Sequence, residues 1–389
     1  MFVNKRQFIN SLLSIPWLVL ALFKLFPMKS NLYFSVIAIG IIAISSCKKL
    51  DPGPINKHVS PGAKIDTDIY VTGYIYALNG HTVAVYWKNG VINRLADSTA
   101  GSEASGIALN GSDVYVSGTL TDVNSNPTAA VYWKNGVMTK LADAATTAGI
   151  GISQCGCDVY IAGTLTPNSS HYIPVYWKNG IQQQLESHSA IVAVNGMTVH
   201  GGDLYATGVG ITNQRTTYAL YWKNGTAFNL TDTLSQSQGN AIAVNGNDIY
   251  VVGETVQNSQ GIATYWKNGV KMTLQDPNKP DGTTATGIAV KNNDTYISVA
   301  SGFDGSYWIN NSPTYLSNST TQTVPKGITL YNNDVYVAGV AILSPSGSKI
   351  VAVYWKNGAL VVLPTPDGGP GLFSGGAGSS IIVITHSHH

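Results

Sequence analysis

One short phrase returns along this chain at nearly constant intervals, and it constrains the fold more than any other feature. Tyr-Trp-Lys-Asn-Gly first occurs at residues 86–90, and its copies follow one another after 42 to 47 residues. The copy at residues 307–311 is degraded to Tyr-Trp-Ile-Asn-Asn. The tryptophans of the seven copies are Trp87, Trp133, Trp177, Trp222, Trp266, Trp308 and Trp355. Self-similarity at such a period indicates one supersecondary unit repeated side by side.

Each repeat contains four short runs of β-prone residues separated by turn residues. In the second repeat these runs are residues 106–109, 114–117, 130–133 and 137–141. The last two runs are joined by Asn-Gly at residues 135–136, a strong signal for a type I′ hairpin because both positions need positive φ. No window shows a sustained helical period, so each repeat is predicted to form a four-stranded antiparallel sheet.

Four strands in each of seven units of this length are typical of β-propeller blades. We therefore predict an all-β fold, a seven-bladed β-propeller of four-stranded blades over residues 66–385. The β-prone run at residues 380–385 is followed by no further repeat, while the first repeat, residues 68–97, has only a weak first strand. We expect residues 380–385 to complete that first blade and close the ring, which would hide exposed sheet edges. An open β-solenoid is the structural alternative.

The residues before the repeats predict export from the cell. Met28-Lys29 is followed by an apolar run over residues 32–44 and then by small residues, the pattern of a secretory signal peptide. This run is too short to cross a membrane comfortably. A second apolar run precedes it, and we expect translation to start at Met28. The predicted segments are an upstream stretch outside the protein at 1–27, a signal peptide at 28–46, a tether at 47–65 and a tail at 386–389.

The charge of the exported part argues against nucleic acid as a partner. The chain carries 22 basic and 20 acidic groups, and four of the basic ones precede residue 47. Residues 47–389 therefore hold 18 basic against 20 acidic groups, a net charge of about −2. Binding to a phosphate backbone needs a basic surface instead. We expect a monomer, because a closed ring leaves no sheet edge to cover.

Two parts of the sequence resemble known bacterial sequences. Ile44-Ser45-Ser46-Cys47 is similar to the lipobox of bacterial lipoproteins, which implies cleavage before Cys47 and attachment there of lipid with acyl chains such as palmitate. The repeats resemble the HAF-type extracellular repeat and the Tyr-Trp-Lys-Asn-Gly repeats of Bacteroidetes-type surface lipoproteins. This resemblance implies an outer-membrane lipoprotein of the bacterial cell envelope, facing the periplasm or the outside. It implies no catalytic motif.

Residues that recur in every repeat are expected to pack the sheets against one another. The repeated Trp and Tyr side chains are therefore assigned to the core, not to a sugar-stacking surface. The hairpin lysines are predicted to form a ring on one face, either as solvated turn tips that discourage edge pairing or as a binding ring for an acidic polymer. These lysines are Lys88, Lys134, Lys178, Lys223, Lys267 and Lys356. Cys155-Gly156-Cys157 lies at a turn position, which leaves an ordinary turn, a local disulfide or half of a metal site open.

The connection from the second to the third strand varies between repeats, and we expect it on the face opposite the Lys-Asn-Gly turns. A rigid scaffold with variable loops is a common way to build a binding surface. The aromatic or basic candidates for ligand binding in these connections are Tyr74, Tyr76, His81, His171, Tyr172, Arg215 and Phe303. The sequence thus predicts a non-catalytic binding module for a glycan or a protein, with no cofactor and no metal.

Two other functions stay open at this point. A polysaccharide lyase or glycoside hydrolase would need two or more carboxylates, or a His with a Tyr or Arg, at one end of the ring. The available loop residues are Glu103, Glu186, His188 and Glu254. A purely structural envelope protein is the third possibility, and a flat and featureless variable face would favour it.

Overall fold

The computed structural model describes residues 65–387, with gaps at 123, 125, 144–145, 169–170, 277–281, 319–320, 344–348 and 366–376. The described residues form 28 β-strands and no helix. Accordingly, this part of the chain contains no helix with the length and apolar character of a membrane span. The predicted upstream stretch, signal peptide and Cys47 lie outside the described residues, so export and lipidation stay predictions.

The strands are hydrogen-bonded in six sheets, five of which have four strands. One sheet has the order β28-β1-β2-β3, with β28 Ala377–Ser387, β1 Ile65–Tyr76, β2 Thr82–Lys88 and β3 Val91–Arg94. The next comprises β4 Gly101–Asn110, β5 Asp113–Thr121, β6 Pro127–Lys134 and β7 Val137–Asp143. A third comprises β16 Ser237–Asn245, β17 Asp248–Gln257, β18 Gln260–Lys267 and β19 Val270–Thr273. The others are β20 Thr283–Lys291, β21 Asp294–Ser301, β22 Ser306–Ile309 and β23 Ser312–Tyr315, and β24 Thr321–Tyr331, β25 Asp334–Leu343, β26 Lys349–Lys356 and β27 Ala359–Val362.

The sixth sheet has eight strands and consists of two four-stranded sets. The first set is β8 Thr146–Cys155, β9 Asp158–Asn168, β10 His171–Lys178 and β11 Ile181–Gln184. The second set is β12 Ile191–His200, β13 Asp203–Ile211, β14 Thr217–Lys223 and β15 Thr226–Asn229. A single parallel pair, Tyr172 with Ile191, connects the two sets. Within each set the neighbouring strands are antiparallel, as they are in the other five sheets.

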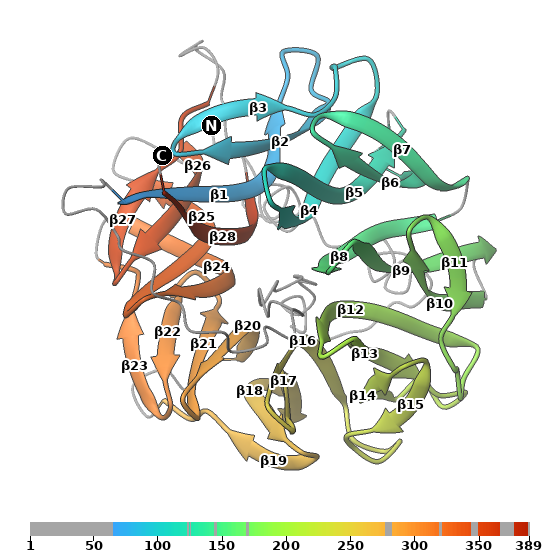
Figure 1. The fold of residues 1–389 in the computed structure, drawn as a ribbon. Helices are drawn as coiled ribbons and strands as arrows, with labels where there is room; N and C mark the ends of the chain where they lie inside the picture. Colours follow the sequence, from blue (N-terminus) through green and yellow to red (C-terminus); the bar gives the residue numbers. More distant parts are fainter. Residues whose placement is uncertain are drawn as a thin grey trace, which may run out of the picture.

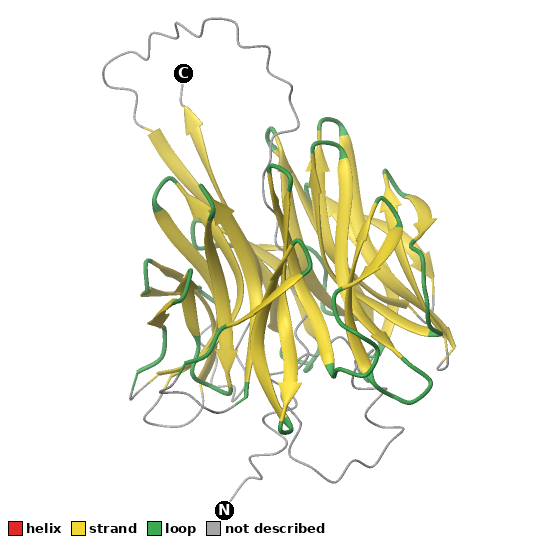
Figure 2. Cartoon of the chain, turned by 90° about the horizontal axis from the view of Figure 1, so that it is seen from below, coloured by secondary structure: helices red, strands yellow, loops and turns green. Residues whose placement is uncertain are grey.

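The sheets are arranged around a central axis (Figure 1). We call the strand of each set that lies nearest this axis its first strand; these are β4, β8, β12, β16, β20, β24 and β28. Each first strand contacts the next in this order, and β28 also contacts β4. Seen from the side, the connections gather at the two ends of the strands (Figure 2). Because the strands of a set alternate in direction, the Lys-Asn-Gly turns share one end, here called the turn end. The second-to-third connections share the other, the variable end.

The C-terminal strand pairs with the N-terminal one, which confirms the pairing predicted from the sequence. β28 runs antiparallel to β1 from the pair Ile65–Ser387 to the pair Tyr74–Ala377. The strand is therefore longer than the predicted residues 380–385, and it includes part of the expected tail. Its side chains Ile381, Ile382 and Val383 are buried, so this strand contributes to the core as well as to the hydrogen-bonded sheet.

A β-bulge interrupts most of the first strands at the same place. The register shifts between Ala104 and Gly106 in β4, and equivalent shifts occur in β12, β16, β20 and β24. One residue at each shift has no partner in the ladder, and we call its place the bulge position. The bulge positions are Ser105, Asn195, Asn240, Thr286 and Lys326. A bulge breaks the two-residue alternation, which explains why the sequence predicted only the second half of these strands.

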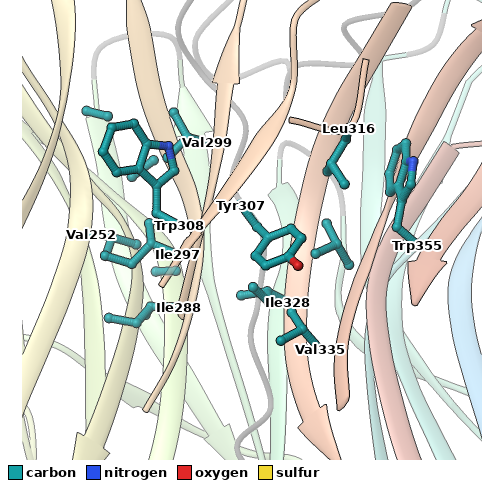
Figure 3. Close-up of a cluster of buried hydrophobic side chains, with 14 of the residues drawn as sticks. Val252, Ile288, Ile297, Val299, Tyr307, Trp308, Leu316, Ile328, Val335 and Trp355 are labelled. Carbon is teal, nitrogen blue, oxygen red and sulfur yellow. The ribbon is translucent and has the colours of Figure 1, made fainter. Parts of the chain in front are cut away.

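The repeated Trp side chains lie between the sheets, as predicted, whereas the Tyr that precedes each Trp is only half-buried in six of the seven repeats. Six of the seven repeat tryptophans are fully buried, and Trp308 is 4% exposed. One cluster brings Trp308 and Tyr307 of β22 together with Ile328 of β24 and Trp355 of β26, on neighbouring sheets (Figure 3). Each sheet is therefore covered by its neighbour, and truncating one such Trp to Ala is expected to cost about 3–5 kcal/mol.

Candidate functional site

The turn end is built from one arrangement that recurs in almost every repeat. The Asp of the repeated Asp-x-Tyr phrase on the second strand forms an ion pair with the hairpin Lys, with N–O distances of 2.8 to 3.4 Å in six repeats. The same Lys lies over the ring of the Tyr two residues after that Asp, 5.1 to 5.5 Å from its centroid. In the degraded repeat Ile309 replaces the Lys, so this cation–π contact is missing there.

The hairpin Asn completes the arrangement in all seven repeats. Its side-chain amide donates to the Asp carboxylate at 2.6 to 3.0 Å. Its side-chain oxygen accepts the backbone N–H of the residue after that Asp, for example Ile69 N–H to Asn89 Oδ1 at 2.8 Å. The Asn residues have φ between 50° and 55°, the left-handed geometry that a type I′ turn needs and that Asn tolerates. The predicted hairpin is confirmed, and the repeat motif is explained by these contacts.

These contacts neutralise the ring of hairpin lysines locally. The hydrogen bonds and charge of Lys134 and Asn135 lower the pKa of Asp113, and the corresponding contacts lower the pKa of Asp158 and Asp334. The bond to Asp113 in turn raises the pKa of Lys134. Because each ammonium group already has a carboxylate and an aromatic ring beside it, the six lysines do not form an unpaired basic ring. The turn end thus supports the turn-tip interpretation better than an acidic-polymer site.

The Cys-Gly-Cys sequence forms an ordinary turn between β8 and β9. Cys155 pairs with Asp158 at the end of the ladder, and Gly156 has φ of 60°. Cys157 is a free and exposed thiol, so the local Cys155–Cys157 disulfide that the sequence left open is not formed. Groups of three or more His, Cys, Asp or Glu side chains able to hold a metal ion are not found among the described residues.

The variable end contains more strand and less loop than the sequence predicted. Tyr74 and Tyr76 belong to β1, and Tyr172 belongs to β10. The prediction that they are loop residues is wrong, because the second and third strands continue their ladder beyond the repeated phrases. Thus β17 reaches Gln257 and turns through two residues with positive φ, Asn258 and Ser259. Extension of the hairpin gives backbone groups ladder partners that a loop would lack.

Three of the seven ligand-binding candidates come together at this end. Tyr74 and Val340 form a small buried cluster, against which Tyr76 and Phe303 pack. The rings of Tyr74 and Tyr76 meet edge to face with their centroids 5.6 Å apart. Tyr76 and Phe303 keep part of their surface exposed, whereas Tyr74 is buried. This aromatic group is therefore half core and half surface.

The other four candidates are not part of this cluster. His81 is half-buried in the β1–β2 connection, and His171 is exposed at the start of β10. Tyr172 is buried where β10 meets β12. Arg215 is exposed in the β13–β14 connection, with φ of 66°. The candidate set thus divides into one cluster and four separate positions.

The connection that carries Phe303 is fixed to β24. The backbone N–H of Thr323 donates to the carbonyl of Phe303 at 2.7 Å. The N–H of Gly305 donates in return to Thr323 Oγ1 at 2.9 Å. A Cβ on Gly305 would lie 2.4 Å from Pro325, so only glycine permits this approach. Phe303 is thereby held close to the β24 segment that includes Lys326.

An acid and a base on two of the first strands influence each other electrostatically at this end. Glu103 is the third residue of β4, and Lys326 occupies the bulge position of β24. Lys326 is 5% exposed, and Glu103 keeps part of its surface exposed. Burial raises the pKa of Glu103 to about 7, while the charge of Lys326 opposes that rise. Burial likewise lowers the pKa of Lys326 to about 8, and the charge of Glu103 opposes that fall. Groups whose pKa values are perturbed by burial and a nearby charge are concentrated at functional sites.

Glu103 also acts on the aromatic cluster. Burial raises the pKa of Tyr76, its hydrogen bond with Tyr74 lowers it, and the charge of Glu103 raises it further. The aromatic cluster and the acid–base pair therefore belong to one site, formed by Tyr74, Tyr76, Phe303, Glu103 and Lys326. We call this group the variable-end site.

Lys326 was missed by the sequence reasoning, although a signal was present. It precedes Gly327-Ile-Thr-Leu, at the place where Ser105 and Thr286 precede the corresponding phrases. A charged residue in place of a small polar one distinguishes this repeat. The bulge that gives the place its meaning is visible only in the strand register.

The remaining residues considered for catalysis lie elsewhere. Glu186 is exposed, accepts the backbone N–H of Ala227 at 2.8 Å and lies 3.2 Å from His188. Glu254 is buried on β17 and accepts a hydrogen bond from Gln238 at 3.1 Å. The variable-end site therefore pairs one carboxylate with an ammonium group instead of a second carboxylate.

Comparison with known proteins adds information on the fold. No protein-family model and no curated protein sequence matches this chain. A puromycin hydrolase structure resembles it with a TM-score of 0.54, 10% identity and coverage of 78% of this chain and 53% of that one. A puromycin-hydrolyzing peptidase of Mycobacterium tuberculosis gives a TM-score of 0.50, 10% identity and coverage of 78% and 54%. This chain thus spans about half the length of either protein.

A third solved structure is described as the β-propeller domain of the Trilobed protease from Pyrococcus furiosus. It has 8% identity and a TM-score of 0.45, over 78% of this chain and 98% of that domain. At such identities a likeness concerns the fold alone. The radial arrangement of the sheets (Figure 1) defines the class of this protein, an all-β fold of the β-propeller type.

Proposed function

We propose that this protein is a lipid-anchored β-propeller of the bacterial cell envelope that binds a glycan or protein ligand at its variable end without catalysing a reaction. In this proposal the propeller has seven blades, each with four strands, and the ring is closed by β28. The succession of contacts between first strands, from β4 to β28 and back to β4, supports that count. The lipobox-like sequence before Cys47 supports the anchor.

One contrast carries the assignment of the binding surface. At the turn end the same Asp, Lys and Asn contacts recur and leave the charges paired. At the variable end, Glu103 and Lys326 are unique to their repeats and shift each other's pKa without forming an ion pair. Groups that satisfy themselves in every repeat stabilise the fold, whereas unpaired groups in one place are available to a ligand.

A binding screen tests this proposal. The full chain is applied to arrays of glycans and envelope proteins, and each ligand found is then measured with two variants. Phe303→Ala alters the variable-end site, while Lys134→Gln alters the turn end and serves as the matched control. We expect the first variant to lose binding and the second to keep it. Ligands that depend on Lys134 and ignore Phe303, or the absence of any ligand, would contradict the proposal.

The anchor has a separate test. Replacing Cys47 with Ala removes the residue that is expected to carry the lipid, so the variant should leave the membrane fraction and become soluble. A Cys47→Ala protein that stays with the membrane would rule out this anchor. Replacing the exposed Cys157 with Ala is the control, because it changes a thiol that is not expected to carry lipid.

A further inference from the structure

We propose that the turn end of the propeller lies against the surface of a lipid bilayer, with a rim of exposed aliphatic side chains in contact with the lipid. This inference rests on the lipid anchor of the proposed function and deepens it, because it names the surface that the anchored protein presents to the membrane. The variable end then faces away from the membrane, where its site is open to ligands.

The rim is formed by the residue that follows each hairpin turn between the third and fourth strands, here called the post-turn position. It is the first residue of the fourth strand, which lies at the periphery of each set (Figure 1). The Val and Ile side chains at this position are 65 to 70% exposed. Five of the seven repeats have an aliphatic residue there, namely Val91, Val137, Ile181, Val270 and Ala359, and the other two have Thr226 and Ser312.

Packing between the sheets does not explain these aliphatic residues, since most of their surface is exposed. Single apolar residues scattered over a surface are normal, but these return at one position of several repeats. The preference of strands for β-branched residues gives one reason for Val and Ile. Thr226 shows that a polar β-branched residue fits the position as well. An apolar partner outside the chain therefore explains the aliphatic side chains better than strand formation does.

The charges beside the rim are compatible with contact to lipid. The post-turn residue is the ladder partner of the hairpin Lys, as in the pairs Val91–Lys88 and Val137–Lys134. Each of these lysines forms an ion pair at 2.8 Å, and its side chain is 43 to 48% exposed. Aliphatic groups beside Lys side chains suit the boundary between lipid headgroups and acyl chains. Because the charges of each ion pair cancel, we expect the contact to depend on the aliphatic groups and not on anionic lipid.

The chain enters the propeller at the turn end, which supports the same orientation. Ile65, the first described residue, pairs with Ser387 and precedes Asp68, which forms the ion pair with Lys88 at this end. The 18 residues from 47 to 64 reach at most roughly 65 Å, at about 3.6 Å per residue. β1 has 12 residues and is roughly 40 Å long, at about 3.3 Å per residue. With the variable end on the membrane, most of that reach would run along the propeller, whereas the connection from the turn end is direct.

Fluorescence quenching by lipid tests the inference. The full chain with its lipid is inserted into phosphatidylcholine vesicles that contain a lipid with a nitroxide on its headgroup, which quenches a fluorophore at short range. One protein is labelled at the exposed Cys157, in the β8–β9 turn at the turn end. The matched protein combines Cys157→Ala with Leu78→Cys, which places the label in the β1–β2 connection at the variable end, where Leu78 is fully exposed. We expect quenching at residue 157 to be about threefold or more stronger than at residue 78, with or without added phosphatidylglycerol.

Variants connect the contact to the rim. Changing Val91, Val137, Ile181 and Val270 together to Thr keeps β-branched side chains and removes much of the aliphatic surface. This variant should lose about half or more of the quenching at residue 157. The matched control changes Leu78 and Leu234 to Thr, because both are exposed aliphatic residues in connections at the variable end. It should leave the quenching at residue 157 unchanged, and thermal unfolding verifies that each variant folds.

Three results with the anchored protein would overturn the inference: quenching at residue 78 as strong as at residue 157, quenching that survives the four Thr substitutions, and quenching that requires phosphatidylglycerol. In each case the protein is still in the vesicles, so the lipid anchor stands and only the contact of the aliphatic rim falls. Wild-type protein that does not associate with the vesicles would overturn the anchor and this inference together.

Discussion

Replacing the buried Lys326 with Met is expected to make the protein more stable at neutral pH. Burial lowers the pKa of Lys326 from 10.5 to about 8. That difference is roughly 3 kcal/mol at about 1.36 kcal/mol per pKa unit, and it measures how strongly the folded protein disfavours the charged form. Met keeps an apolar stem of similar length and removes the ammonium group, so the folded state no longer bears this cost.

Loss of the attraction to Glu103 offsets part of the gain. The offset is limited, because Glu103 already has a pKa of about 7 and becomes neutral readily. We expect a net stabilisation of roughly 2 kcal/mol, in the range found when buried ion pairs are replaced by apolar residues. The natural residue would then lower stability in exchange for a function, as active and binding sites often do.

The pH dependence supplies the sharper test. Because the folded-state pKa of Lys326 is depressed, its contribution to stability is present above pH 10.5 and is lost as the pH falls through about 8. The advantage of Lys326→Met should therefore be full below pH 8 and should shrink as the pH approaches 10.5. Urea unfolding followed by circular dichroism at several pH values measures it.

Lys271→Met is the control for this experiment, since Lys271 is exposed and surface substitutions stay within about 0.5 kcal/mol. A Lys326→Met protein that is less stable than the wild type at pH 7 would refute the reasoning. So would an advantage that does not change between pH 7 and 10. Either result would mean that Lys326 is a well-paired structural residue.

Three further predictions concern the fold and the acid of the site. The raised pKa of Glu103 should make the wild type lose stability as the pH rises from 4.5 through about 7, because the protonated acid is favoured in the folded protein. Glu103→Gln should remove this loss, and identical pH profiles of the two proteins would contradict the prediction. Asn89→Ala should cost about 2 kcal/mol, from the left-handed φ of 51° and the lost bonds to Ile69 and Asp68. Asn93→Ala, at a half-exposed position of β3, should change stability little in the same urea titration. Ile382→Ala should cost about 2–5 kcal/mol, since this fully buried residue of β28 packs against the neighbouring sheet; a cost no larger than that of the exposed Val362→Ala would argue against a ring held by β28.

Much of the architecture was predictable because it repeats. Each hairpin is encoded locally, by an Asn whose φ is positive and by side chains a few residues apart in a strand. Seven copies reinforce the same signal, and the pairing of β28 with β1 follows from counting strands. The sequence also identified the buried Trp residues, since a residue needed in every repeat has to serve packing.

The partners of the repeated charged residues were harder to predict from the sequence. From the sequence alone, the ring of hairpin lysines could be a binding surface. In the structure each Lys instead forms an ion pair with the Asp about twenty residues earlier, on the adjacent strand. That contact depends on register, which places Lys88 opposite Tyr70. Strand extension likewise moved Tyr74 and Tyr172 out of the loops in which they were expected.

The sequence by itself determined the unit, its four strands, its turn and the identity of its core, because these depend on neighbours close along the chain. Only the tertiary structure decided which unrepeated residues meet. Glu103 and Lys326 are more than two hundred residues apart, and their charges influence each other because the first strands pack around one axis. A bulge at Lys326 also changes the direction of its side chain. Contacts between distant repeats depend on how the sheets close on one another, and no local pattern encodes that geometry.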